Sequence, residues 1–209
     1  VDFLWWVAVL GVLLAMVLYT APSRAAFDMQ AQEQRAIEGV NRDLLRQMAA
    51  LQAGANIVND TSALRDDEAM VKVVAESGAS LILMHRKGSP RDMQQGGGPV
   101  YHEVIAEVVD FLSQRLDFAI RGGINQTRIA VDPGIGFGKR NADNLAILNQ
   151  VRRFAELGCP VVIGASRKRF IGEVLGVAEP RDRMIGSVAC ATIAATNGAS
   201  IIRAHDVLE

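Results

Sequence analysis

The sequence has few cysteines, few aromatic residues and no large excess of charge of either sign. Its two cysteines, Cys159 and Cys190, are too few for a disulfide framework, and both lie in apolar stretches typical of reduced core thiols. They also lack the close spacing typical of a metal-binding pair. The formal net charge is -1, which argues against a non-specific nucleic-acid binder because such proteins are usually basic. A chain of 209 residues can bury a sizeable core without disulfides or a metal.

Charged residues are also missing from Phe3 to Ser23, where Leu, Val, Ala and Trp dominate. This run is long enough to span a bilayer as a helix, with Trp5 and Trp6 near one end and Tyr19 near the other. Basic residues follow it, namely Arg24, Arg35, Arg42 and Arg46. We therefore expect residues 1–23 to form a transmembrane or signal-like helix, with a cytoplasmic catalytic part anchored to the inner membrane. A cleaved signal peptide and a gene-fusion product are the alternatives, although the run has no basic residues before it.

Residues 24–50 are predicted to form an amphipathic linker helix, because apolar residues recur there at spacings of three and four. These residues are Ile37, Val40, Leu44, Leu45 and Met48, and Leu51 continues the pattern. The stretch from Met48 to Gly54 fits the last turn of a barrel helix equally well, with Gly54 as its C-cap.

Short apolar segments alternate with helical patterns over residues 51–209. The predicted strands are Ala55–Asn59, Ser80–His85, Arg128–Asp132, Pro160–Gly164 and Ser200–Arg203. The predicted helices are Glu68–Ser77, Tyr101–Arg121, Ala142–Leu157 and Arg183–Thr196. This alternation predicts a parallel α/β fold, because continuous apolar strands are typical of sheets covered on both faces. Polar residues follow each strand, which favours a (β/α) barrel with one shared mouth over an open doubly wound sheet.

The run from Asp132 to Lys139 contains three glycines at alternate positions directly after a predicted strand. Glycines allow a positive φ and a close approach of the backbone to a flat ligand, and Phe137 offers a ring for stacking. A P-loop is excluded, because only three residues separate Gly134 from the Gly-Lys pair and Arg140 replaces the required Ser or Thr. An ordinary glycine-rich loop is the alternative.

Other strand ends carry groups that suit an anionic, heterocyclic ligand. Arg203 and His205 share one face of an extended strand and could clamp a phosphate. Asn59 can both donate and accept at the edge of a heterocycle. Ser166–Lys168 places two cations after a strand, although Ser166 could be a helix cap and the cations a solvated surface. His85 could be a ligand or a loop anchor.

Taken together, the motifs resemble those of dihydropteroate synthase, a pterin-binding barrel, from about residue 48 to 209. The residues that carry the resemblance are Ile57-Val58-Asn59-Asp60, Met84-His85 with Gly88, Pro90, Met93 and Gln94, Tyr101, Asp132 to Lys139, Asn144, Gly164 with Ser166-Arg167-Lys168, Arg183 with Gly186-Ser187, and Arg203 with His205-Asp206-Val207. The pterin-binding methyltransferases that use methyltetrahydrofolate share the scaffold and the Asn and Asp positions. The Ser166-Arg167-Lys168 motif and the motif of Arg203 with His205-Asp206 favour the synthase.

The resemblance implies a Mg²⁺-dependent transferase of folate biosynthesis. It would join 6-hydroxymethyl-7,8-dihydropterin pyrophosphate to p-aminobenzoate, giving 7,8-dihydropteroate and pyrophosphate. The pterin would be held by Asn59, Asp132 and Lys168, in a slot lined by Met84, Phe137 and Gly164. Arg203 and His205 would bind the pyrophosphate and, with Lys168, would be the catalytic residues. The p-aminobenzoate would be flanked by Ser166, Arg167 and Lys168.

The resemblance does not extend to residues 1–50, where the family's first three strands and its metal-binding Asn are not found. We therefore expect a partial TIM-type (β/α)₈ barrel with about five of the eight strands, over residues 51–209, and little or no synthase activity from this chain alone. No metal ligand is identified in the sequence. Family members are commonly dimers, so a homodimer is expected. The alternatives are a catalytically dead, membrane-anchored fragment or fusion product, and a methyltetrahydrofolate-binding methyltransferase module.

Overall fold

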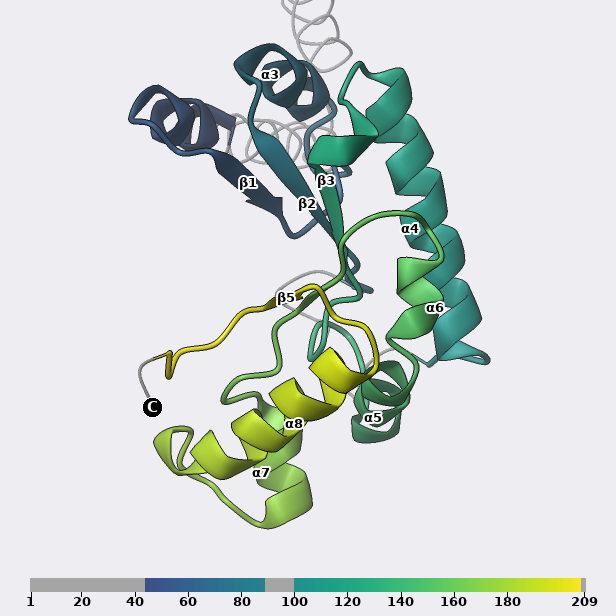
Figure 1. The fold of residues 1–209 in the computed structure, drawn as a ribbon, viewed down its shortest axis with the longest axis vertical. Coiled ribbons are helices and arrows are strands. Elements are labelled where there is room, and N and C mark those ends of the chain that lie inside the picture. The colour runs from purple at the N-terminus through teal and green to yellow at the C-terminus, as the bar shows by residue number, and fades with distance from the viewer. Residues whose placement is uncertain (1–43, 89–99, 208–209) are drawn as a thin grey trace, which may run out of the picture. The chain divides into compact units, whose positions relative to one another are not determined.

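Parallel strands alternate with helices along the part of the chain that the structure describes. The structure, a computed structural model, describes residues 44–88 and 100–207 (Figure 1). A helix over residues 44–52 comes first and is followed by Gly54, whose φ is 99°. The later elements are β1 (Ile57–Asp60), α3 (Ala69–Ser77), β2 (Ser80–Met84), α4 (Val104–Arg121), η2 (Gln126–Arg128), β3 (Ile129–Asp132), α5 (Asn141–Asn149), α6 (Arg152–Ala155), β4 (Val162–Ile163), α7 (Arg169–Leu175), η3 (Arg181–Arg183), α8 (Met184–Thr196) and β5 (Ile201–Ile202). The predicted α/β class is confirmed.

The five strands are parallel and lie side by side in chain order. β1 pairs with β2 and β2 with β3, so that Val58 lies opposite Leu81 and Leu83 opposite Val131. A parallel bridge between Val131 and Val161 links β3 to the pair of β4 and β5. Because all five strands run the same way, their carboxyl ends meet at one edge, where ligands bind in folds of this type.

Apolar side chains of the strands and helices form the core. Leu81, Leu83 and Val131 are fully buried in the strands. The long helix α4 runs along β2 and β3 and buries Leu112 and Val108 (Figure 1). These two residues are four apart and therefore share one helical face.

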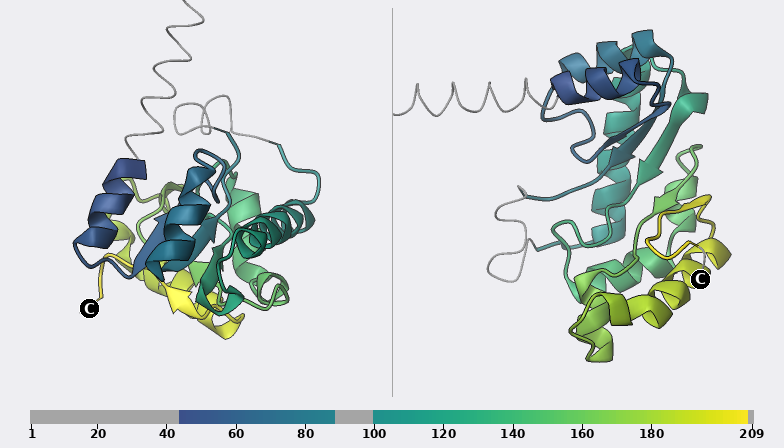
Figure 2. Two further views of the ribbon diagram at one scale, coloured as in Figure 1. Left: turned by 90° about the horizontal axis from the view of Figure 1, so that it is seen from above. Right: turned by 90° about the vertical axis from the view of Figure 1, so that its left-hand side faces the viewer.

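Two helical features differ from the prediction. The predicted helix Ala142–Leu157 is broken into α5 and α6, and the intervening bend brings Val151 and, in α6, Phe154 into the core, where both are fully buried. Helix α7 was not predicted, because its seven residues are too few to show a helical period. It packs against α8, which in turn contacts β5 (Figure 2).

Apolar side chains are exposed on the outermost strands. Ile57 in β1 and both residues of β5, Ile201 and Ile202, are exposed. None of the helices within residues 44–88 and 100–207 combines the length and the apolar character needed to cross a membrane. The predicted membrane helix, residues 1–23, lies outside the described residues, as does most of the linker helix predicted over residues 24–50.

Candidate active site

The carboxyl ends of the strands surround a cavity of about 270 Å³. It is lined by residues at the ends of β1, β2, β4 and β5 and by a residue of the loop after β3. They are Asn59, Thr61, Met84, Phe137, Gly164, Ser166, Lys168, Arg203, Ala204 and His205. Eight of the ten substrate-binding residues predicted from the sequence are in this set, and the other two, Asp132 and Arg167, are not.

Asp132 lies directly behind the cavity and is fully buried. Its Oδ1 accepts a hydrogen bond of 2.7 Å from the Gly134 N–H, and its Oδ2 accepts one of 2.9 Å from the Arg203 guanidinium. Burial raises the pKa of the Asp132 carboxyl, and the charge of Arg203 opposes this effect. Asp132 therefore fixes a cation that itself faces the cavity.

Gly164 leaves room for that cation. A Cβ atom at this position would lie 2.6 Å from a terminal nitrogen of Arg203, which is shorter than any normal contact. The absence of a side chain at Gly164 thus allows the Arg203 guanidinium to cross the end of β4 and reach Asp132 in β3.

Lys168 and Phe137 form another wall of the cavity. The Lys168 Nζ lies 4.1 Å from the centroid of the Phe137 ring, within the range of a cation–π interaction. Burial lowers the pKa of Lys168, and the charge of Asp132 opposes the shift. A flat, apolar face and a donor therefore lie next to each other.

His205 is held by Ser166. The Ser166 hydroxyl oxygen accepts a hydrogen bond of 3.2 Å from the His205 backbone N–H and lies 3.0 Å from its Nδ1. Ser166 thus joins the loop after β4 to the chain after β5, which places His205 beside Arg203 at the mouth of the cavity.

Arg167 points to the chain after β5 rather than into the cavity. Its guanidinium forms an ion pair with Asp206. Its backbone has a φ of 58°, and its N–H donates to the Ser187 hydroxyl at 2.9 Å. The left-handed conformation turns Arg167 away, so that Lys168, the next residue, faces the cavity.

The loop after β1 has a strained backbone that the sequence did not indicate. Ala63 and Leu64 are both fully buried and have φ values of 54° and 65°, a region that residues with a Cβ rarely adopt. Arg115 of α4 donates to the carbonyl oxygens of Ala63 at 2.7 Å and Leu64 at 3.1 Å. The Asp60 carboxylate accepts from the Leu64 N–H at 2.9 Å. These bonds hold the loop next to Asn59.

A second pair of residues under the site was also missed. The Lys139 Nζ lies 2.8 Å from the Nδ1 of His85, and both side chains are buried. The only sign of Lys139 in the sequence was its place at the end of the glycine run, where it was considered only as part of a P-loop motif that the spacing excludes. His85 contacts other protein groups in the core, as expected of a loop anchor.

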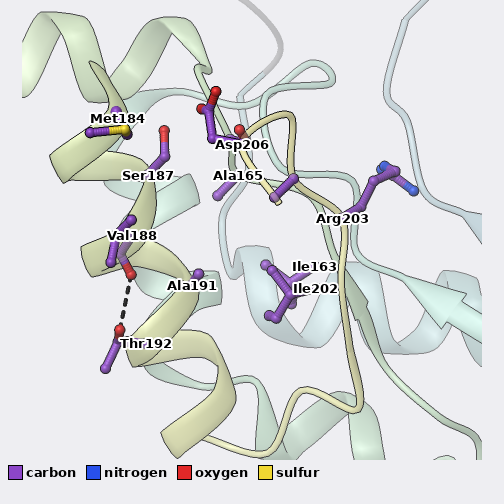
Figure 3. Close-up of a pocket in the computed structure, with 12 residues that line it drawn as sticks. Ile163, Ala165, Met184, Ser187, Val188, Ala191, Thr192, Ile202, Arg203 and Asp206 are labelled. Atoms are coloured by element: carbon purple, nitrogen blue, oxygen red, sulfur yellow. Dashed lines mark hydrogen bonds between the residues drawn. The ribbon is translucent and has the colours of Figure 1, made fainter. Parts of the chain in front are cut away.

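A second, mostly apolar cavity of about 220 Å³ lies between α8 and the strands β4 and β5 and shares Ser166, Arg203 and Ala204 with the cavity at the strand ends (Figure 3). Ala191 lies on the side of α8 toward Ile163 and Ile202, whereas the Arg203 side chain points away from α8 (Figure 3). This cavity lies on the helix side of the strands and is more apolar than the strand-end cavity. It lacks Asn59, Lys168 and His205, which line the strand-end cavity.

Comparison with known proteins confirms the resemblance. Residues 44–205 match the family described as pterin binding enzyme. The chain is 39% identical over 167 residues to dihydropteroate synthase of Escherichia coli strain K12, covering 80% of this chain and 57% of the relative. It is also 39% identical over 171 residues to the Synechocystis enzyme of the same name, covering 82% of this chain and 58% of the relative.

Solved structures give the same result. Dihydropteroate synthase from Stenotrophomonas maltophilia, with imidazole bound in its active site, aligns with a TM-score of 0.72 and 43% identity, covering 76% of this chain and 59% of that one. The Xanthomonas albilineans enzyme in complex with 7,8-dihydropteroate aligns with a TM-score of 0.71 and 43% identity, covering 77% and 59%. The chain thus spans less than two thirds of the length of these relatives.

Proposed function

Because the chain belongs to the family of pterin binding enzymes, we propose that its strand-end cavity is the substrate site of a dihydropteroate synthase. The reaction joins the amine of p-aminobenzoate to the methylene carbon of 6-hydroxymethyl-7,8-dihydropterin pyrophosphate, in folate biosynthesis. A C–N bond forms, the C–O bond to pyrophosphate breaks, its electron pair leaves with the pyrophosphate oxygen, and the amine loses a proton. Positioning and stabilisation of the leaving anion therefore matter more than a strong base.

The observation that best supports this proposal is that one cavity combines an edge with hydrogen-bond donors and acceptors, an aromatic wall and a cationic mouth. Asn59 lies at one end of this set, Phe137 with Lys168 forms the wall, and Arg203 with His205 forms the mouth. A pterin pyrophosphate has the matching parts, namely a polar heterocyclic edge, a flat ring and a polyanionic tail.

In this proposal the pterin ring is held by Asn59, Asp132 and Lys168. The amide of Asn59 can donate and accept at the ring edge, and the amine of Lys168 can donate. Asp132 is fully buried and paired with Arg203, so its carboxylate has to turn toward the cavity to accept from the ring's N–H donors. Met84, Phe137 and Gly164 line the slot around the flat ring.

Arg203 and His205 hold the pyrophosphate. Arg203 has five N–H donors, and one of them is occupied by Asp132 at 2.9 Å, so others remain for phosphate oxygens. Hydrogen bonds that strengthen as negative charge develops on the leaving oxygen lower the barrier to its departure. Together with Lys168, these two residues are the proposed catalytic groups.

Ser166, Arg167 and Lys168 flank the p-aminobenzoate. Ser166 and Lys168 line the cavity itself. Arg167 contributes through Asp206, since its guanidinium pairs with that carboxylate and thereby fixes the chain after β5. The second substrate would approach over the Phe137 ring, where its own ring can stack.

Among residues 44–88 and 100–207, the carboxylates near the cavity are not free to hold the Mg²⁺ ion that the family implies. Within residues 44–88 and 100–207 there is no group of three His, Cys, Asp or Glu residues that could hold a metal. The carboxylates nearest the cavity are engaged: Asp60 accepts from Ser62 and Leu64, Asp132 pairs with Arg203, and Asp206 pairs with Arg167. No step of the proposed reaction is therefore assigned to a metal.

We also propose that the five described strands are part of a TIM-type (β/α)₈ barrel. The exposed Ile57 of β1 and the exposed Ile201 and Ile202 of β5 lie on the outermost described strands, where further strands and helices would bury them. A homodimer, and a membrane anchor through residues 3–23, remain proposals that rest on the sequence alone.

Calorimetric titration of the full chain tests the proposal. We expect the pterin pyrophosphate to bind, p-aminobenzoate to bind to that complex, and a sulfonamide to compete with p-aminobenzoate. Binding of methyltetrahydrofolate without a p-aminobenzoate site would instead indicate a methyltransferase module. No pterin binding at all would indicate a dead fragment and contradict the proposal.

A further inference from the structure

Lys139 is a buried amine to which the proposed reaction gives no role. Only 7% of Lys139 is exposed. The Nζ lies 2.8 Å from the Nδ1 of His85, which follows β2, and donates at 3.2 Å to the carbonyl oxygen of Phe137, in the loop after β3. A single amine therefore ties together two loops that form the cavity wall.

His85 is a neutral hydrogen-bond partner for this amine. Burial, followed by the charge of Lys139, lowers the pKa of His85 to about 2, so the imidazole is neutral at physiological pH. Nδ1 accepts from this amine when the ring proton is on Nε2. The ring packs edge-on against Phe111, with centroids 4.8 Å apart, which fixes its orientation.

The loop that carries Phe137 depends on such ties. Gly134, Gly136 and Gly138 have φ values of 72°, 80° and 64°, in the left-handed region that glycine enters freely. Three glycines at alternate positions make the backbone permissive, so its conformation has to be set by contacts. Asn144 accepts from the Gly136 N–H at 2.8 Å, and Lys139 holds the carbonyl of the intervening Phe137.

We propose that Lys139 is a positioning residue: by holding the Phe137 carbonyl and the His85 ring, it sets the Phe137 ring against the Lys168 amine and so shapes the pterin slot. The ring and the amine are 4.1 Å apart. The inference rests on the proposed function only for the identity of the ligand. The arrangement of Phe137 and Lys168 can be measured without any ligand.

The first readout is the ring-current shift that the Phe137 ring imposes on the ε-protons of Lys168. It is measured by NMR of the full chain with labelled lysine, and Phe137→Leu identifies the shift. In Lys139→Met we expect most of this shift to be lost. Lys72→Met is the matched control, because the Lys72 side chain is 79% exposed on α3 and should leave the shift unchanged.

The second readout separates positioning from general damage. We expect Lys139→Met to weaken binding of a pterin about tenfold, because the Phe137 ring and the Lys168 amine no longer shape the slot, while inorganic pyrophosphate binds within about twofold of wild type. An equal loss for both probes means general disruption and overturns the proposal. An unchanged Lys168 shift with unchanged pterin binding also overturns it.

If Lys139→Met does not fold, His85→Phe decides, because it keeps the ring packing against Phe111 and removes the acceptor. A reduced ring-current shift in this variant supports the proposal, and an unchanged shift overturns it. Failure of the wild-type chain to bind a pterin would contradict the proposed function. It would leave the ring-current result standing, so the two failures are distinguishable.

Discussion

The ion pair between Arg203 and Asp132 can be broken by Arg203→Met, which keeps the apolar length of the side chain and removes the guanidinium. Asp132 Oδ2 then loses its partner at 2.9 Å, and the carboxylate retains the Gly134 N–H on Oδ1. Because Asp132 is fully buried, water cannot readily replace the lost donor.

The expected loss of folding free energy depends on how deeply Asp132 and Arg203 are buried. Removing one partner of a fully buried ion pair costs about 3–5 kcal/mol. Here 43% of the Arg203 side chain is exposed, so its charge is partly screened by solvent. We therefore expect the free energy of unfolding to fall by about 1–2 kcal/mol at neutral pH.

The cost should depend on pH in a defined direction. Burial raises the pKa of Asp132 in the native state, and removal of Arg203 raises it further. A raised carboxyl pKa favours the folded state below its unfolded pKa, and this stability is lost as pH rises through the folded pKa. The penalty of Arg203→Met is thus largest at neutral pH and shrinks as the carboxyl is protonated.

Urea unfolding measures the loss of stability and its dependence on pH. It compares wild type, Arg203→Met, Asp132→Asn and the double variant at neutral pH and at about pH 4, near the ordinary carboxyl pKa. Arg181→Met, at an exposed position in η3, is the control for loss of a surface cation. An equal penalty at both pH values, or additive single losses, would refute the reasoning.

Three further perturbations have expected outcomes. Arg115→Met should lower the free energy of unfolding by about 1–2 kcal/mol, because the carbonyl oxygens of Ala63 and Leu64 lose their hydrogen bonds. Arg121→Met, at the exposed end of α4, should change it little, and urea unfolding measures both. Gly164→Ala should displace the Arg203 guanidinium and weaken pyrophosphate binding at least about tenfold in calorimetry, with a smaller effect on folding. Burial lowers the pKa of Lys139 to about 7, so the contribution of its neutral amine to stability is fully present above the unfolded pKa and is lost as pH falls through about 7. The free energy of unfolding of wild type relative to Lys139→Met should therefore rise from about pH 7 to 10. A difference that does not change with pH would contradict this.

Much of the fold could be predicted from the sequence, because its periodicity is strong. All five strands were predicted within two or three residues of their positions, and α3, α4 and α8 likewise. The continuous apolar runs of the strands and the four-residue spacing on α4 are local patterns that survive without knowledge of the partner elements. The division into α5 and α6 was not predictable, since it depends on where Val151 and Phe154 find space in the core.

The site could be predicted to the extent that its residues have distinctive chemistry. Asn59, Lys168, Arg203 and His205 stand at strand ends, and the structure brings them to one cavity. The contacts between those residues could not be predicted. Arg167 pairs with Asp206 because its backbone is left-handed, which no local pattern indicates.

The supporting residues were missed for the same reason. Arg115 lies in the middle of α4, 52 residues from the Ala63 carbonyl that it holds, and nothing in its neighbourhood distinguishes it from a solvated cation. The partner of Lys139, His85, is 54 residues away. Long-range hydrogen bonds of this kind are fixed by packing and become visible only in the folded structure.

The most direct test of the account is a titration of the ¹⁵N-labelled full chain with a pterin, followed by two-dimensional NMR. We expect shifts at the side-chain amide of Asn59 and the backbone N–H groups of Gly134 and Gly136, with none at Val188 beside the apolar cavity of α8. Shifts confined to Val188 and its neighbours, or no shifts at saturating pterin, would contradict it.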